Sequence, residues 1–265
     1  MKYIFLLLVM VFELSAGVIK SPIVSIDEDG ETARIQIAKI DVGMSGFVSH
    51  QISANHSSIL KNAVVVAYNA TTQVATLKLS PYNGLVNNAL PSGKWKVEVG
   101  DTAIFAFAYN RALLIAPSEE IYHQISKSVQ IQWIHPDLFA TVLSFRGHPT
   151  PLKEDFIAMS ASGSVGLLFI YLDKKVYMLD INSFALLSIS DAPLVQDSVK
   201  LPFYSRVDEI DAAWWGEGSN EMEEYEPHYY ELLVENNKQN KALYEIIKNG
   251  DEKYHELLEE FEIGE

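Results

Sequence analysis

The sequence predicts an α+β protein: a small N-terminal β-barrel-like segment, then a compact α/β unit, then an acidic helical tail. Three observations lead to this fold class. Up to residue 109, short runs that alternate apolar and polar residues recur between glycine-rich corners. From 110 to 207, continuous apolar runs alternate with helix-like segments. From 208 onward, the composition becomes strongly acidic.

Residues 1–16 have the pattern of a secretion signal. Lys2 precedes an uncharged, mostly apolar run at 3–12, and Ala16 supplies a small residue at the expected cleavage site. The run is shorter than the roughly 20 residues that a membrane-spanning helix needs. A buried strand or helix is the alternative. We therefore expect an exported protein, in the periplasm or on the outer cell surface, with no integral membrane segment after signal cleavage.

Residues 17–109 are predicted to form the β-rich, barrel-like domain. Gly43 and Gly46 permit tight backbone bends at a barrel corner, and Asn69–Thr72 has the composition of a hairpin turn. Period-two alternation or β-branched residues indicate the strands, which are expected at 18–20, 23–26, 33–40, 64–68, 73–79, 97–99 and 102–105.

Residues 110–207 are predicted to form the α/β domain. The apolar run 112–116 is typical of a strand covered on both faces, and further strands are expected at 131–134, 166–172, 176–181 and 184–189. Ser118 is the expected N-cap of a helix whose apolar stripe contains Ile121 and Ile125. Two more helices are expected, at 137–145 and from Pro151 onward.

The C-terminal part divides into an acidic linker, 208–228, and an acidic helical tail, 229–265. Residues 207–265 contain 18 acidic and 4 basic residues, a net charge of −14. Such a segment repels nucleic acids and anionic lipids, so no nucleic-acid partner is expected. Helices are predicted at 229–248 and 251–261. The adjacent Trp214 and Trp215 are expected to attach the linker to the protein body or to a partner.

The composition excludes several kinds of chemistry. There is no cysteine, which rules out thiol catalysis and thiolate metal sites. No hydrolase, zinc-protease or phosphate-loop motif is present. His135 with Asp137, and separately His148, are the most site-like residues, and a hydrolase using them is one hypothesis. We favour structural roles at helix starts, and predict a non-enzymatic protein that has no cofactor.

Five stretches together resemble the N-terminal domain of the PgbA family of bacterial plasminogen-binding surface proteins. They occur in order between about Val18 and Val207, at 40–46, 110–117, 133–140, 147–156 and 201–207. The motifs include Arg111, His135, Asp137, His148 and Arg206, for which structural roles are expected. The resemblance implies an exported or surface protein that captures plasminogen, and it implies no enzymatic activity.

The expected plasminogen contacts are internal lysines. The resemblance implies recognition by kringle modules, which bind a lysine ammonium with a nearby carboxylate. Longer family members carry a lysine-rich C-terminal region, whereas this chain ends in Glu265. Lys174 and Lys175, at a predicted turn beside an acidic residue, are the first candidates, and Lys94 and Lys96 are the second. Ordinary solubilising lysines are one alternative, and an envelope scaffold that binds another bacterial protein through its acidic tail is the other.

Overall fold

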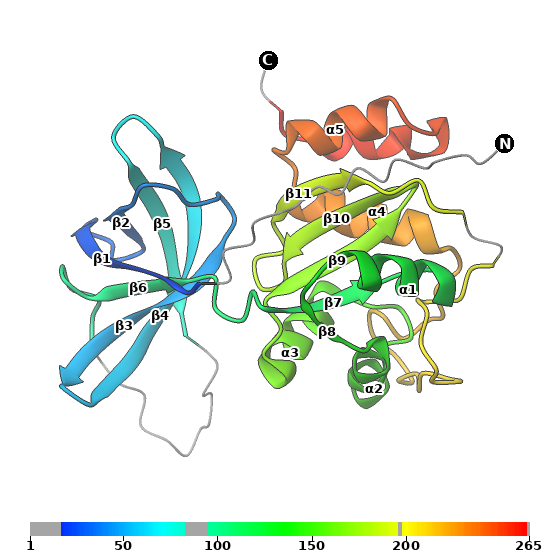
Figure 1. Ribbon diagram of the computed structural model, residues 1–265, viewed down its shortest axis with the longest axis horizontal. Coiled ribbons are helices and arrows are strands. Elements are labelled where there is room, and N and C mark those ends of the chain that lie inside the picture. Colours follow the sequence, from blue (N-terminus) through cyan, green and yellow to red (C-terminus); the bar gives the residue numbers. More distant parts are fainter. Residues whose placement is uncertain (1–16, 83–94, 196–197, 264–265) are drawn as a thin grey trace, which may run out of the picture.

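The computed structural model describes residues 17–82, 95–195 and 198–263. It contains a closed six-stranded barrel and a separate five-stranded sheet with helices on both faces (Figure 1). The predicted α+β class is therefore confirmed. The predicted secretion signal lies outside the described residues.

The barrel is built entirely from antiparallel pairs, in the order β1-β2-β5-β4-β3-β6. Alternate side chains along its strands fill the interior, as the period-two pattern predicts, and Ile23, Ile35, Val65 and Leu77 are almost completely buried. The strands are β1 (Ile19–Ile26), β2 (Thr32–Gln36), β3 (Ser45–Ser53), β4 (His56–Asn69), β5 (Val74–Pro81) and β6 (Thr102–Phe105).

One expected barrel strand is absent. Residues 97–99 are not in a strand; they lead into a turn that precedes β6. Asp101 fixes this turn because its carboxylate accepts a 2.8 Å hydrogen bond from the backbone N–H of Glu98. Gly100 adopts a φ of 99° and donates its N–H to Ile23. The prediction failed because valine on either side of Glu98 imitates strand alternation.

The second sheet has the order β11-β10-β9-β7-β8, with β7 parallel to both of its neighbours. Its strands are β7 (Arg111–Ile115), β8 (Gln132–Ile134), β9 (Leu167–Leu172), β10 (Lys175–Asp180) and β11 (Leu186–Asp191). β7 is covered on both faces, as its continuous apolar run predicts. Leu113 packs in the core toward α2, α3 and α4, whereas Leu114 packs toward the barrel and α1.

The first helix begins where the sequence predicts, and the next two begin within two residues of their predicted starts at 137 and 151. The three helices are α1 (Glu119–Ser128), α2 (Pro136–Arg146) and α3 (Lys153–Gly163). The Ser118 hydroxyl caps α1 by accepting a hydrogen bond from the N–H of Ile121. Ile121 and Ile125 are buried, which confirms the predicted apolar stripe.

The acidic tail packs on the α/β unit. Its helices are α4 (Tyr225–Asn236), which begins inside the predicted linker 208–228, α5 (Lys241–Lys248) and the 3-10 helix η1 (Glu252–Glu260). Tyr229 and Leu233 of α4 are fully buried in the core that α2, α3 and the sheet also form (Figure 1). The single helix expected at 229–248 is wrong, since it is interrupted after Asn236. At this break the Asn237 side chain donates to the carbonyls of Leu233 and Phe184 and accepts the N–H of Leu186, which ties the end of α4 to the sheet.

The barrel is joined to the sheet at Asp180, which is completely buried at the end of β10. From the barrel, Ser45 donates both its backbone N–H and its hydroxyl to Oδ2 of Asp180, at 2.8 and 2.7 Å. Ser183 donates its hydroxyl to the carbonyl of Gly43, at 2.6 Å. Within the described part of the chain, none of the helices has the length and hydrophobicity of a membrane-spanning segment.

Candidate functional site

The first lysine candidates lie at the turn between β9 and β10. Asp173 and Lys174 form the turn with positive φ angles of 41° and 61°, and both side chains are exposed. Lys175 is different, because its ammonium lies 2.5 Å from the carboxylate of Asp191 and is only partly exposed. Glu226 lies at the same place and accepts the Asp173 N–H at 3.3 Å. The turn thus presents one exposed ammonium, that of Lys174, among three carboxylates.

The second lysine candidates belong to the barrel. Lys94 lies outside the described residues. Lys96 is exposed, and the neighbouring Trp95 is 55% exposed, with its ring 5.7 Å from that of His50. The sheet carries Lys174 and Lys175, whereas Lys96 precedes a barrel strand, so the two candidate pairs belong to different units.

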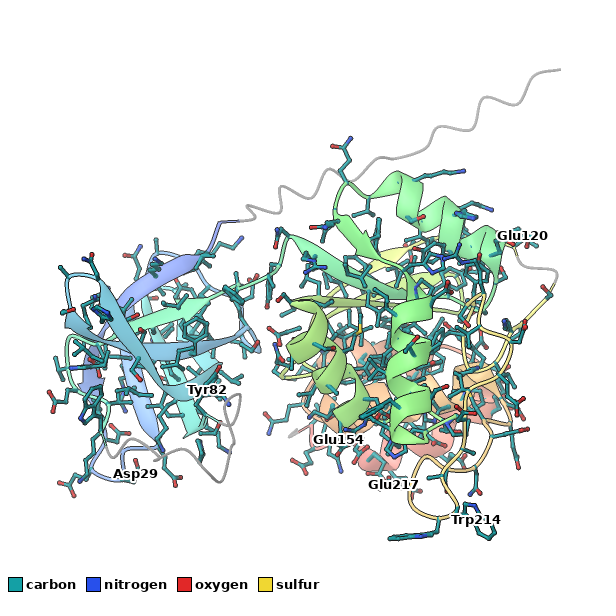
Figure 2. The ribbon with its side chains drawn as sticks, turned by 90° about the horizontal axis from the view of Figure 1, so that it is seen from below. Asp29, Tyr82, Glu120, Glu154, Trp214 and Glu217 are labelled. Carbon is teal, nitrogen blue, oxygen red and sulfur yellow. The ribbon has the colours of Figure 1, made fainter. Side chains whose placement is uncertain are left out.

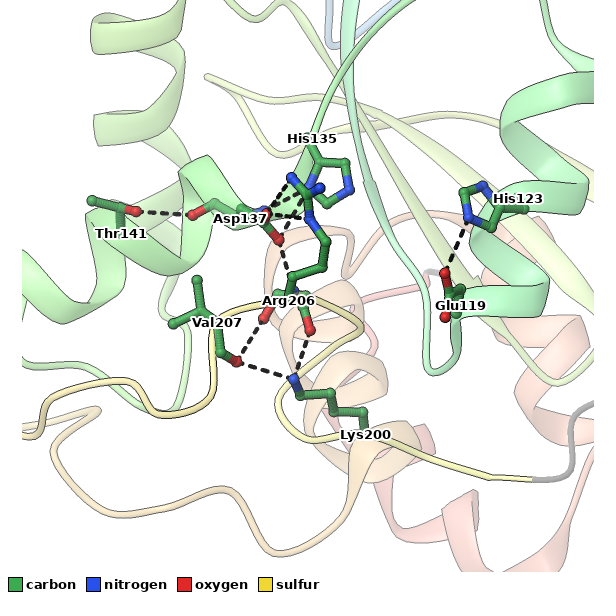
Figure 3. Close-up of polar contacts among 9 residues, drawn as sticks. Glu119, His123, His135, Asp137, Thr141, Lys200, Arg206 and Val207 are labelled. Atoms are coloured by element: carbon green, nitrogen blue, oxygen red, sulfur yellow. Dashed lines mark hydrogen bonds and ion pairs between the residues drawn. The ribbon is translucent and has the colours of Figure 1, made fainter.

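His135 and Asp137 hold the start of α2 against the segment that follows the sheet (Figure 3). Nδ1 of His135 accepts the Asp137 N–H at 3.2 Å and thereby caps the helix. Both carboxylate oxygens of Asp137 are occupied by Arg206, whose backbone N–H and Nε each donate at 2.7 Å. Burial acts to raise the pKa of Asp137, but the hydrogen bonds and charge of Arg206 outweigh it and lower that pKa.

His148 serves a second, separate carboxylate. Asp155 is fully buried and accepts hydrogen bonds from Nδ1 of His148 at 2.9 Å, from Nε of Arg146 at 2.5 Å and from the Leu152 N–H at 2.7 Å. These bonds close the connection between α2 and α3. His135 and His148 thus lie beside different carboxylates, those of Asp137 and Asp155. Every oxygen of these carboxylates already accepts a hydrogen bond within the protein, so the two histidines do not form one catalytic group.

The described residues contain no group of three histidine or carboxylate side chains placed to hold a metal ion. The contacts of His135, Asp137, His148 and Arg206 are those of helix starts and loop attachments. In the structure these motif residues position α2, α3 and the 201–207 segment.

The junction at Asp180 was not singled out from the sequence. Its carboxylate accepts hydrogen bonds from five donors, two of them in Ser45, far away in the sequence. A local signal existed, since Asp180-Ile181-Asn182-Ser183 places an aspartate two and three residues before N–H groups that it can bind. That signal indicates a turn and says nothing of the distant barrel.

Comparison with known proteins places the chain in a family. The family model described as "Plasminogen-binding protein pgbA N-terminal" matches residues 18–233. The chain belongs to this family. The match includes the barrel, the five-stranded sheet and most of α4, so the PgbA N-terminal unit extends beyond Val207, where the recognisable motifs end.

Two curated relatives are both named Plasminogen-binding protein PgbA and come from Helicobacter pylori strains J99 and 26695. Each is 29% identical to this chain over 220 residues, which is 80% of this chain. The aligned region is 47% of the J99 protein and 46% of the 26695 protein, so the chain matches less than half of each relative. No solved structure matches it significantly.

Proposed function

We propose that this chain is an exported, non-enzymatic binding protein whose ligand is plasminogen. Membership of the PgbA N-terminal family carries the proposal, because both curated relatives are named for plasminogen binding. The named activity belongs to proteins about twice as long as the matched region, so its presence in this chain needs a local determinant.

The β9–β10 turn supplies that determinant. A lysine-binding module needs an accessible ammonium with a carboxylate nearby, and Lys174 and Asp173 are both exposed at the tip of the turn. Lys175 contributes less because Asp191 already neutralises it. Lys96, beside the exposed Trp95, is the second choice. An exposed charge pair contributes about 1 kcal/mol or less, so binding will be weak and will fall with added salt.

The test is plasminogen binding by the mature protein, measured by surface plasmon resonance with and without 6-aminohexanoate, a lysine analogue. Lys174→Ala/Lys175→Ala should reduce the analogue-sensitive binding by at least fivefold. Lys39→Ala/Lys78→Ala is the matched control, because both residues are exposed on the barrel and the change in charge is the same. If the first variant still binds, Lys174 and Lys175 are not the contact residues, but plasminogen remains the ligand. The absence of analogue-sensitive binding refutes plasminogen as the ligand.

Export rests on the pattern in residues 1–16 and has its own test. Protein recovered from the cell envelope should have lost about 16 residues, so that it begins near Gly17. Intact-mass spectrometry measures this directly. A full-length mass in the envelope fraction would contradict a cleaved signal.

A second candidate function is an envelope scaffold that binds another bacterial protein through its acidic C-terminal part. The exposure of Trp214 and Trp215, at 100% and 85%, favours it, since exposed indoles are typical of contact surfaces. Two results together would support the scaffold: the chain does not bind plasminogen, and it binds a bacterial protein only while its acidic C-terminal part is present.

A further inference from the structure

The outer face of α2 is apolar although it faces solvent. A surface helix normally turns polar and charged residues outward. The inner face of α2 is buried through Phe139, Ala140 and Leu143. On the outer face, Leu138 is 56% exposed and Phe145 is 93% exposed, and their spacing of seven residues puts both on one side of the helix. The helix therefore presents apolar side chains to solvent as well as to the core.

The polar residues of α2 do not change the character of this face. Asp137 and Arg146 are its two charged residues, one at each end, and they form ion pairs with Arg206 and Asp155. The hydroxyl of Thr141 donates to the carbonyl of Asp137 at 2.9 Å, so it is turned back onto its own helix. The outer face of α2 thus offers a partner apolar contact rather than a free charge.

Two highly exposed tryptophans lie beside the C-terminal end of α2. The N–H of Ala213 donates to the carbonyl of Gly147 at 2.8 Å, and a Cβ added at Gly147 would lie 2.6 Å from Cβ of Ala213. Trp214 follows Ala213 directly, and Phe145 precedes Gly147 by two residues. Trp214 is 100% exposed and points away from the protein body (Figure 2), and Trp215 is 85% exposed. Three exposed aromatic residues therefore belong to this end of α2.

The backbone that carries the tryptophans is attached on both sides of them. Before them, the N–H of Asp211 donates to the hydroxyl of Ser144 at 3.1 Å. After them, the N–H of Thr150 donates to the carbonyl of Gly218 at 3.1 Å. Because the indoles extend from a held segment, a partner does not have to order a free loop when it binds them.

The chain just before the tryptophans is negatively charged. Asp208, Glu209 and Asp211 are exposed, and residues 207–237 include no lysine or arginine. A symmetric contact with a second copy of the chain would bring these carboxylates against their own counterparts, and an anionic lipid surface would be repelled in the same way. A positively charged partner is attracted instead.

We propose that Leu138, Phe145, Trp214 and Trp215 form a docking surface, the aromatic patch, for a cationic amphipathic helix of a partner protein. The apolar side of such a helix packs against the exposed side chains of α2, as one helix packs on another. Its basic side chains lie toward the indoles and the neighbouring carboxylates, which both attract cations. The patch shares no residue with the β9–β10 turn, so the proposal does not rest on plasminogen binding.

The test uses an amphipathic peptide of leucine and lysine, with its leucines on one helical face, and measures its binding to the mature full-length chain by fluorescence anisotropy. Trp214→Ser/Trp215→Ser should weaken binding at least tenfold, and Phe145→Ser about fivefold. Trp95→Ser/Val99→Ser is the matched control, because both residues are more than half exposed on the barrel, and it should change binding by less than twofold. Equal weakening by the two double variants would overturn the proposal.

A second pair of variants tests the charge. Asp208→Asn/Glu209→Gln should weaken binding about threefold, whereas Glu28→Gln/Glu31→Gln, at exposed positions of the barrel, should leave it unchanged. Equal effects of the two pairs would overturn the proposal, because attraction would then come from the overall negative charge. A peptide of the same pattern with glutamate in place of lysine should not bind.

Three further results would overturn the proposal. The first is no binding of the leucine–lysine peptide at millimolar concentration. The second is binding of the chain to phosphatidylcholine vesicles that is lost in Trp214→Ser/Trp215→Ser, which would assign the patch to a membrane. The third is self-association lost in the same variant, which would assign it to a second copy. Thermal unfolding of each variant establishes that the fold is intact. Lys174→Ala/Lys175→Ala should leave peptide binding unchanged, which separates this result from the plasminogen test.

Discussion

The phenol of Tyr109 donates a 2.6 Å hydrogen bond to Oδ2 of Asp180, just before the chain enters β7. Asp180 is fully buried, and the described residues provide it with no basic partner. Five hydrogen-bond donors stabilise the carboxylate instead, from the barrel, from Tyr109 and from the turn after β10. The position of the barrel on the sheet depends on these donors because each would otherwise be buried without a partner.

Replacing Asp180 should therefore destabilise the whole chain. Asp180→Asn retains the size but turns an NH₂ group toward donors, and we expect a loss of about 2–4 kcal/mol in the free energy of unfolding. Tyr109→Phe removes one bond and should cost about 1–2 kcal/mol. Urea denaturation measures both. Asp191→Asn is the control, since its side chain is 81% exposed and its removal should cost less than about 1 kcal/mol. Equal losses in the free energy of unfolding for the substitutions at 180 and 191 would contradict the role of Asp180 in joining barrel and sheet.

The buried tyrosines predict a loss of stability at high pH. Burial raises the pKa of Tyr177 to about 12, and it also raises the pKa of Tyr109, Tyr225 and Tyr229. In the unfolded chain each phenol ionises near its ordinary pKa of about 10. These tyrosines therefore do not lower the free energy of unfolding below pH 10. Above pH 10 that free energy falls as the pH rises, because the unfolded state binds fewer protons than the folded state.

The size of this effect can be measured at one residue. Each tyrosine kept neutral by folding contributes a slope of about −1.4 kcal/mol per pH unit between its unfolded and folded pKa. Tyr177→Phe should reduce the slope by that amount between pH 10 and 12, in urea titrations carried out at a series of pH values. A slope that stays the same in Tyr177→Phe would contradict the assignment of this effect to the buried phenol of Tyr177.

Two glycines with positive φ should respond differently to alanine. Gly43 has a φ of 93°, and an added Cβ would lie 2.3 Å from Cβ of Ala185, across the contact between barrel and sheet. Gly30 has a φ of 68° with no atom within 4 Å of that position. Gly30→Ala should cost only the backbone strain, about 1–2 kcal/mol. Gly43→Ala should cost about 1–3 kcal/mol more, and Ala185→Gly should restore part of it. Equal destabilisation by Gly30→Ala and Gly43→Ala in thermal unfolding would refute the close contact between Gly43 and Ala185.

The acidic segment before α4 should be the first site of proteolysis. Residues 208–224 contain no helix or strand, and Glu217, Glu221 and Glu223 are accessible to a glutamate-specific protease. We expect the first cut there. Because α4 buries Tyr229 and Leu233, the C-terminal fragment should remain bound to the body. Mass spectrometry with size-exclusion chromatography checks both points. A first cut within 110–206, or release of the fragment, would contradict this division of the chain.

The sequence determined the elements whose signals are local. The turn composition of Asn69–Thr72, with a β-branched run before it and alternating side chains after it, predicted the two flanking strands, and Ser118 predicted the start of α1. These signals involve residues only a few positions apart. The order of the five family motifs identified the PgbA N-terminal family. The exposed Lys174 was also predicted locally, from a turn between two apolar strands.

Only the tertiary structure decided what depends on residues far apart. The end of α4 is tied to the sheet because the Asn237 side chain bonds to the backbone of Phe184 and Leu186, and no local pattern contains that contact. A hollow beside α4 is lined in part by Thr150 and Leu152, which come much earlier in the sequence. Asp180 joins barrel and sheet because burial removes water from its carboxylate, so that it must find donors in Ser45 and Tyr109. The energy of a buried polar group depends on every chain segment that surrounds it, and the sequence near that group does not specify those segments.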